Sequence, residues 1–329
     1  MLTLSALLGG ILVGVVGLTV AFYFFARLCR AGTVTWGRII GAAAATFPIY
    51  IAAYFFLRVT AKPNTGVSPF TKSLAANLEP IVVLAVMAVI AKVMLKAPWW
   101  RPTLALVLTW GAAGLPAQYL YTRFVGTTYV ASSNSMAPTL LAWHMIEQCP
   151  QCQGKLMVPA QPPGKGNSSE RADIGICERC REASPNPKVS KTIWPPETFF
   201  VLKFLRPTRW DPVLYIRPDS PTEAPVIGVA RLVGLPGEAL EIREQALWIN
   251  GELAKLPTEI AGMQYHAKED HRQPDGIDRW QTRDSEYVLL GDFTEFSSDS
   301  RFFGSVPARN ILGVVSARRG AGERTAIWR

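Results

Sequence analysis

Long apolar stretches without charged residues dominate the N-terminal third of the chain. Four such stretches lie at residues 2–26, 39–57, 73–91 and 102–122. The third is interrupted by a Glu-Pro pair, and the other three contain no Asp, Glu, Lys or Arg. Crossing a hydrocarbon layer of about 30 Å takes about 20 helical residues. The sequence therefore predicts a membrane anchor of about four transmembrane helices over residues 1–125.

The flanking charges favour an anchor and predict its orientation. The first stretch is long for a cleaved signal peptide, lacks a basic segment before it and is followed by Arg27 and Arg30. Runs of this length also disfavour a soluble bundle of buried helices. Loops 27–38 and 92–101 carry three Lys/Arg each, against three in loop 58–72 on the opposite side. Because basic loops stay in the cytoplasm, we expect a multi-pass protein of the cytoplasmic (inner) membrane, with its soluble domain on the extracytoplasmic side.

The net charge belongs to this apolar third. The chain has 34 Lys+Arg, 25 Asp+Glu and a formal net charge of +9. Ten of the basic residues and one acidic residue precede Val125, so the remainder holds 24 of each and is neutral. Basic residues beside apolar segments suit lipid headgroups. A nucleic-acid partner would need a basic face on the soluble part, so we expect a lipid bilayer as partner and no nucleic acid.

After Val125 the sequence changes to short apolar runs broken by Pro and Gly. Seven of these runs predict strands, at 198–205, 213–216, 226–233, 240–242, 247–249, 287–290 and 311–317. Turn signals lie at 235–238 and at Asn250-Gly251. Because no amphipathic helix pattern separates the runs, we predict a mainly antiparallel β domain. It would comprise residues 126–148 and 190–318, with 319–329 as a tail.

Four of the five cysteines form two Cys-x-x-Cys pairs. These are Cys149 with Cys152, and Cys177 with Cys180. A two-residue spacer lets both thiolates of a pair reach one ion, so the pattern predicts a structural Zn²⁺ site in a ribbon-like insertion over 149–189. Four thiolates leave no open coordination position, which argues against a catalytic metal. Two disulfides are the alternative interpretation, which an extracytoplasmic location permits.

Three segments of the soluble part resemble the motifs of one enzyme family. They are Ser-Asn-Ser-Met-Ala-Pro-Thr-Leu at 133–140, Arg-Leu-Val-Gly-Leu-Pro-Gly-Glu at 231–238, and Gly-Asp at 291–292 followed by Ser-Ser-Asp-Ser-Arg at 297–301. Arg-Trp-Asp at 209–211 is a weaker match to a fourth motif. Order and spacing resemble those of type I signal peptidases, which are membrane-bound Ser/Lys peptidases. The resemblance covers 129–148 and 195–317, with the cysteine segment as an insertion.

The resemblance implies a set of site residues. Ser135 would be the nucleophile that attacks the carbonyl at a signal-peptide cleavage site. The hydroxyl of Ser133 and the backbone N–H of Ser135 would hold the oxyanion. Ser297, Asp299 and Arg301 would orient the site. The family uses no cofactor for catalysis, and its substrates are signal-peptide-bearing pre-proteins with small residues before the cleaved bond.

Several positions depart from the family pattern, among them Phe293 and Thr294, and one departure removes a catalytic group. The lysine that serves as general base directly precedes the Arg-x-Val-Gly-Leu-Pro-Gly run, and here that position is Ala230. A serine hydroxyl needs a partner that takes its proton, and Arg231 stays protonated. One explanation is that another amine reaches Ser135, with Lys203 as the first candidate and Lys191 as the second. The other is that catalysis is lost and a substrate groove remains.

These observations define three hypotheses for function. The first is a membrane-bound serine endopeptidase, a hydrolase that removes signal peptides from exported pre-proteins. The second is a catalytically impaired homologue that binds signal sequences or membrane partners without cleaving them. The third makes the zinc-ribbon-like insertion the working part, as a docking module for a partner at the membrane.

Overall fold

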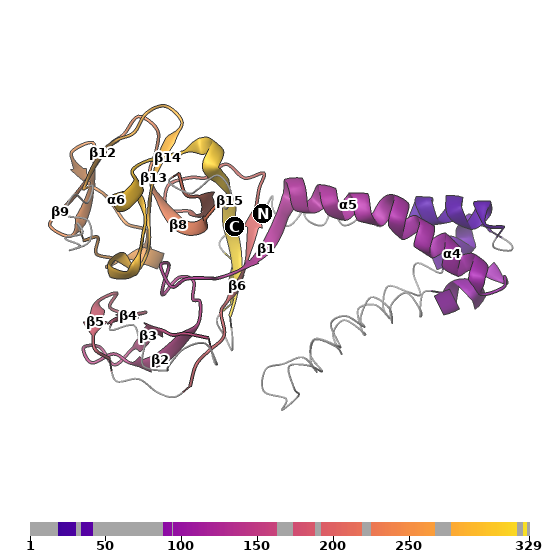
Figure 1. Cartoon of the computed structure of the whole chain (residues 1–329), viewed down its shortest axis with the longest axis horizontal. Helices are drawn as coiled ribbons and strands as arrows, with labels where there is room; N and C mark the ends of the chain where they lie inside the picture. Colours follow the sequence, from indigo (N-terminus) through magenta and orange to yellow (C-terminus); the bar gives the residue numbers. More distant parts are fainter. Residues whose placement is uncertain are drawn as a thin grey trace. The chain divides into compact units, whose positions relative to one another are not determined.

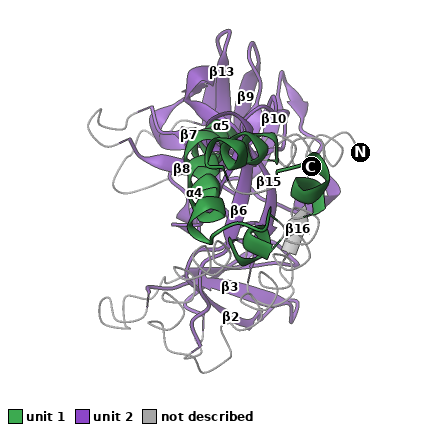
Figure 2. Ribbon diagram, turned by 90° about the vertical axis from the view of Figure 1, so that its right-hand side faces the viewer, with its two compact units in different colours: residues 1–121 green, residues 122–329 purple. Residues whose placement is uncertain are grey.

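The chain divides into two compact units, Met1–Tyr121 and Thr122–Arg329 (Figure 2). The computed structural model describes residues 19–30, 34–41, 88–93, 95–162, 174–187, 192–218, 225–266, 278–320 and 325–327. Most of the predicted spans 2–26, 39–57 and 73–91 lies outside these ranges.

The first unit is helical over most of its described residues. From Trp100 onward it forms three consecutive helical segments, namely α4 (Trp100–Thr109), a π-helix (Trp110–Gly114) and α5 (Leu115–Leu120), and a second π-helix (Tyr121–Val125) continues into the second unit. Side chains in or next to all four predicted spans are buried together: Phe22, Ala26, Ile39, Ala91, Leu95, Ala105 and Leu106. Among the described residues, no single helix combines the length and the apolar character that a membrane span requires.

The second unit is mainly antiparallel β, as predicted. Its strands are β1 (Gly126–Val130), β2 (His144–Gln148), β3 (Lys155–Pro159), β4 (Ile174–Cys177), β5 (Ala183–Pro185), β6 (Thr198–Leu202), β7 (Pro212–Ile216), β8 (Ile227–Gly234), β9 (Ala239–Arg243), β10 (Ala246–Ile249), β11 (Glu252–Leu253), β12 (Arg279–Gln281), β13 (Glu286–Leu290), β14 (Val306–Pro307), β15 (Ile311–Arg319) and β16 (Thr325–Ile327). Its described short helices are three 3-10 turns, Thr258–Ile260, Thr294–Phe296 and Ala308–Asn310, and α6 (Ser300–Phe303).

These strands form three sheets (Figure 1). The largest has the order β1-β6-β15-β7-β8-β13-β14, with β16 paired to β15. A second sheet has the order β11-β10-β9-β12, and the third has the order β2-β3-β4-β5. The path through the large sheet brings β1, which precedes Ser135, into the same sheet as β8, in which the second motif begins, and β13, which the third motif directly follows.

All seven strands predicted from the apolar runs are present. The turn predicted at Asn250-Gly251 is also confirmed, because both residues have positive φ, 51° and 83°, between β10 and β11. The 198–205 run ends as a strand at Leu202, before Lys203. Strand β1 was not predicted, since its Gly-Thr-Thr-Tyr-Val sequence directly follows the apolar stretch.

The cysteine segment has a sheet of its own. Strand β2 pairs with β3, so this sheet begins at His144 and not at the predicted boundary, residue 149. The chain leaves and returns through a short neck, where the backbones of His144 and Trp194 are paired. Next to this neck the buried Glu197 accepts a hydrogen bond from the Leu141 N–H at 3.0 Å, and its own N–H donates to the Leu141 carbonyl at 2.8 Å.

Two cores lie on the β8 and β13 region of the large sheet. One joins the small β9–β12 sheet to this region and includes Leu240, Ile242 and Trp280. The other buries Ala230 with Val213, Leu232 and Leu289. Strands β8 and β13 are therefore packed on both faces, which gives the motif residues at their ends a rigid support.

Candidate active site

Ser135 lies in a tight turn, residues 134–140, that follows β1 and is called the Ser135 turn below. The turn is fastened by the buried Asn134, whose side-chain amide donates to the Trp143 carbonyl and whose Oδ1 accepts the Ala142 N–H, both at 2.9 Å. Within the turn, the Leu140 N–H donates to the Met136 carbonyl at 2.8 Å. The Asn134 side chain therefore holds the two ends of this loop together. Ser135 itself is only partly buried.

The structure brings the two predicted serine hydroxyls together. Ser133 Oγ and Ser135 Oγ lie 3.1 Å apart, within hydrogen-bonding distance, and either hydroxyl can be the donor. Ser133 is exposed to solvent. If Ser135 attacks a carbonyl, a second hydroxyl at this distance is suited to donate to the oxyanion that forms.

The backbone of Ser135 is held from the motif that follows β13. Its carbonyl accepts hydrogen bonds from Ser297 Oγ at 2.8 Å and from the Phe293 N–H at 3.0 Å. This approach requires a glycine at 291, because a Cβ there would overlap Ser297 Oγ and lie 2.7 Å from the Ser135 carbonyl oxygen. Gly291 is thus a contact residue of the site.

Asp299 and Arg301 form a buried ion pair, with Nη2–Oδ2 at 2.7 Å and Nε–Oδ1 at 2.9 Å. Asp299 also accepts the Gly291 N–H at 2.8 Å, and the other guanidinium nitrogen donates to the His266 carbonyl. A buried pair with all these bonds fixes the turn that contains Gly291 and Ser297. The predicted supporting residues therefore lie together around the Ser135 carbonyl.

A second buried ion pair joins the remaining motifs, and the sequence did not reveal it. Arg231 binds Asp292 with two bonds, Nε–Oδ1 at 2.7 Å and Nη2–Oδ2 at 2.5 Å, and it donates to the Trp210 carbonyl. Thr139 of the Ser135 turn donates its hydroxyl to the same carboxylate. Burial alone lowers the pKa of Arg231, whereas the Asp292 carboxylate raises it, and the net shift is upward. The signal available in the sequence was that Arg231 and Asp292 each belong to one of the recognised motifs.

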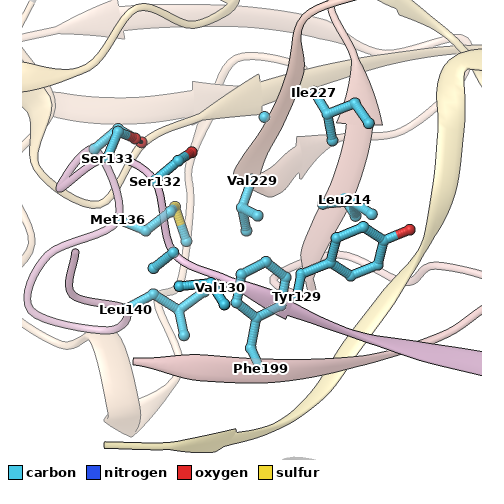
Figure 3. Close-up of a pocket in the computed structure, with 13 residues that line it drawn as sticks. Tyr129, Val130, Ser132, Ser133, Met136, Leu140, Phe199, Leu214, Ile227 and Val229 are labelled. Carbon is cyan, nitrogen blue, oxygen red and sulfur yellow. Dashed lines mark hydrogen bonds between the residues drawn. The ribbon is translucent and has the colours of Figure 1, made fainter. Parts of the chain in front are cut away.

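A pocket of about 160 Å³ opens beside the serines. Its lining is mostly apolar and includes Met136, Leu214 and Val229. Figure 3 shows Ser133 on one side and the Tyr129 and Phe199 rings on the other, with the ring centroids 5.8 Å apart. The lining residues include no Lys, His, Asp or Glu. The pocket therefore suits an apolar segment but supplies no general base.

The structure does not bring Lys203 to Ser135. Its ammonium donates to the Thr122 carbonyl at 2.7 Å, and its backbone N–H donates to Val125. Val125 precedes β1, whereas Ser135 follows it, and five strand residues span about 17 Å at about 3.3 Å each. Lys191, the second candidate, lies outside the described residues. At the family's lysine position, Ala230 is 1% exposed and packs in an apolar cluster.

The four paired cysteines converge in the β2–β5 sheet. All four Sγ atoms lie within 4.8 Å of one another, with Cys152 and Cys177 at 3.4 Å and Cys149 and Cys180 at 3.8 Å. They are free thiols, because a disulfide bond is about 2.05 Å long. A hydrogen bond from the Gly154 backbone lowers the pKa of Cys152 to about 7, and burial raises the pKa of Cys180 to about 12. The cluster is thus close enough to hold one metal ion.

Comparison with known proteins identifies the family. Residues 99–319, two thirds of the chain, match the model of the family described as "Signal peptidase, peptidase S26". The chain therefore belongs to the signal peptidase family, peptidase S26.

Individual relatives are similar over part of their length. Signal peptidase I V of Bacillus subtilis (strain 168) is 32% identical over 114 residues, which is 33% of this chain and 64% of that protein. Signal peptidase IB of Staphylococcus aureus (strain Mu50) is 33% identical over 104 residues, 27% of this chain and 51% of that protein. The chain thus spans about half to two thirds of these relatives. A signal peptidase I structure from Enterococcus faecalis V583 is 27% identical, covering 33% of this chain and 97% of that one, with a TM-score of 0.26.

Proposed function

We propose that this chain is a membrane-bound serine endopeptidase that removes signal peptides from exported pre-proteins. One observation carries the proposal: the Ser135 hydroxyl lies 3.1 Å from the Ser133 hydroxyl at the edge of an apolar pocket. The Ser135 carbonyl is fixed at the same time by Ser297 and Phe293. An extended apolar segment with small side chains fits beside such a serine.

In the proposed reaction, Ser135 Oγ attacks the carbonyl carbon of the cleaved bond and gives its proton to solvent water, because the pocket lining supplies no side-chain base. The resulting oxyanion receives hydrogen bonds from the Ser133 hydroxyl and the Ser135 N–H, each worth on the order of 3 kcal/mol. The C–N bond then breaks, the leaving amine takes up a proton from water, and a further water hydrolyses the ester on Ser135. Ser297, Asp299 and Arg301 act by positioning, because their bonds end on the Ser135 carbonyl or on Gly291. The apolar stretches of the first unit support attachment to a bilayer, where a tethered substrate also lies.

A second candidate function is a binding protein that recognises signal sequences without cleaving them. The pocket lining favours it, because a serine without a base is a weak nucleophile. Ala230 supplies no amine, and Lys203 is bound at the other end of β1. The two candidates share one groove and differ only in whether a proton acceptor reaches Ser135.

We further propose that the four cysteines bind structural Zn²⁺. Tetrahedral zinc with Zn–S bonds of about 2.3 Å places its sulfur atoms about 3.8 Å apart, close to the observed separations of 3.4 and 3.8 Å. A Cβ on Gly154 would lie 3.2 Å from Cys152 Sγ, so the glycine permits the close approach. Metal analysis of the purified chain should find one zinc per molecule; two disulfides without metal would refute the assignment.

Cleavage and binding are separated by one experiment on the full chain in lipid vesicles. Wild type, Ser135→Ala and Ser133→Ala are each given a membrane-tethered pre-protein, and both product formation and photocrosslinking to the pre-protein are measured. The peptidase proposal predicts that Ser135→Ala abolishes cleavage and that Ser133→Ala reduces it roughly 10²-fold, while both variants still crosslink. Crosslinking without cleavage by wild type would support the binding function. Equal cleavage by wild type and Ser135→Ala would refute the nucleophile assignment.

A further inference from the structure

The cysteine insertion begins directly behind the Ser135 turn. Strand β2 starts at His144 and leads straight to Cys149. The two chain segments that connect the insertion to the β domain are hydrogen-bonded to each other at two points. His144 pairs with Trp194 through the backbone, and Glu197 makes two hydrogen bonds with Leu141. Any change in the geometry of the insertion therefore reaches the Ser135 turn through a short, constrained connection.

The two faces of the insertion's sheet pack in two different buried clusters. On one face, Leu156 and Val158 of β3 are buried with Cys149 and Cys177. On the opposite face, Met157 of β3 is buried in a different cluster. Because neighbouring side chains of a strand point to opposite faces, a single strand carries both contacts.

The cluster around Met157 joins the insertion to the segments that hold Ser135. Met157 and Ile176 of the insertion are 1% and 3% exposed and pack with Ala137, Leu141 and Phe293. Ala137 and Leu141 belong to or adjoin the Ser135 turn. Phe293 is the residue whose N–H donates to the Ser135 carbonyl. The insertion therefore touches both the nucleophile's turn and a residue that fixes it.

A polar contact reinforces this arrangement. Arg181 directly follows Cys180 and has a positive φ of 61°. Its guanidinium Nη2 donates to the Glu259 carbonyl at 2.8 Å, next to the β9–β12 sheet. The second cysteine pair is thus linked to a segment of the β domain outside the insertion.

We propose that the four-cysteine insertion is a metal-dependent positioning element for Ser135. Its strands are only three to five residues long, and a sheet this small depends on a bound metal for its rigidity. With the thiolates bound to one ion, the Met157 face supports the Ser135 turn and Phe293. Loss of the metal releases that support. The inference rests on the proposed metal site but does not depend on catalysis.

Hydrogen exchange on the full chain in detergent tests the proposal without any activity measurement. The zinc-loaded protein is compared with protein stripped by a chelator and with stripped protein given zinc again. Amides of the Ser135 turn and of Phe293 should lose at least tenfold protection on stripping and regain it with zinc. Helix α4 of the first unit serves as the internal reference and should not change. A protein that binds no metal, or a Ser135 turn that keeps its protection after stripping, overturns the proposal.

Met157 variants separate support of the turn from metal binding. Met157→Ala should keep the full zinc content yet lose protection in the Ser135 turn, and Met157→Leu, which conserves volume, should retain it. Leu247→Ala removes a similarly buried side chain, 3% exposed, from the core of the β9–β12 sheet and is the matched control. If the chain cleaves pre-proteins, Met157→Ala should lower kcat more than it raises KM. Equal loss of protection in Met157→Ala and Leu247→Ala would refute a specific positioning role.

Discussion

Gly291→Ala tests whether the spacing between the two motifs sets the position of the nucleophile. The added Cβ would lie 2.7 Å from the Ser135 carbonyl oxygen and would overlap Ser297 Oγ. Ordinary contact begins at 3.4 Å, so the Ser135 carbonyl must move by about 0.7 Å, from 2.7 to 3.4 Å, unless Gly291 itself moves. Ser297 must also rotate away and give up its 2.8 Å hydrogen bond.

The expected loss follows from that displacement. A misplacement of about 1 Å at a reacting group costs on the order of 10²-fold in rate, so we expect kcat/KM to fall roughly 10²-fold. Inserting a methyl group into a filled space also costs about 1–3 kcal/mol of stability. The variant should therefore fold, with a lower thermal midpoint and a misplaced Ser135.

Cleavage of a pre-protein and thermal unfolding in the same detergent are the assays. Exchange of the Phe293 amide, which donates to the Ser135 carbonyl, reports the displacement even without turnover. Gly111→Ala is the matched control, since a Cβ there meets nothing within 4 Å and helical alanine is favourable. Wild-type cleavage and an unchanged Phe293 amide in Gly291→Ala would refute the reasoning.

Three further substitutions have distinct expected outcomes. Ala230→Lys should leave cleavage unchanged, because residue 230 packs with Val213 on the sheet face opposite to Val229, which lines the Ser135 pocket; a rise of roughly 10²-fold or more, the usual contribution of a general base, would show that the new lysine reaches Ser135. The apolar surroundings of residue 230 should lower the pKa of the new lysine. The variant should therefore be least stable at low pH and gain stability as pH rises toward about 10.4, the pKa of a lysine in the unfolded chain. A pH-independent melting point would argue against burial of the lysine. Lys203→Ala should leave cleavage unchanged, because its ammonium is bound to a carbonyl at the far end of β1; lost cleavage would restore Lys203 as the base. Asp299→Asn should cost about 3–5 kcal/mol, because the Arg301 side chain is 0% exposed and loses its counter-charge; an unchanged thermal midpoint would contradict this.

The strand pattern and the motifs were readable from the sequence because they are local signals. Apolar runs bounded by Pro and Gly predicted every strand that carries a motif, and Asn250-Gly251 predicted a turn by its tolerance of positive φ. The spacing of the cysteines predicted their convergence for the same reason. Ser133 and Ser135 are two residues apart, so their proximity required no knowledge of the fold.

The site contacts that the sequence did not reveal depend on which strands pair and how the sheets pack. Lys203 was assigned to a strand, but nothing local indicated that β6 pairs with β1 so that this lysine lies at the end away from Ser135. The pairing of Arg231 with Asp292 likewise depends on β8 lying beside β13. The contact of Met157 with Phe293 depends on how a separate sheet packs on the large one.

The central claim is that Ser135 is the residue that attacks the substrate, and trapping the covalent intermediate tests it most directly. Wild-type chain is mixed with a pre-protein, quenched in acid during the first turnovers and mapped by mass spectrometry. The account predicts an acyl group from the substrate on the peptide that contains Ser135, absent from Ser135→Ala. Cleavage accompanied by an adduct on another residue, or undiminished cleavage by Ser135→Ala, would contradict it.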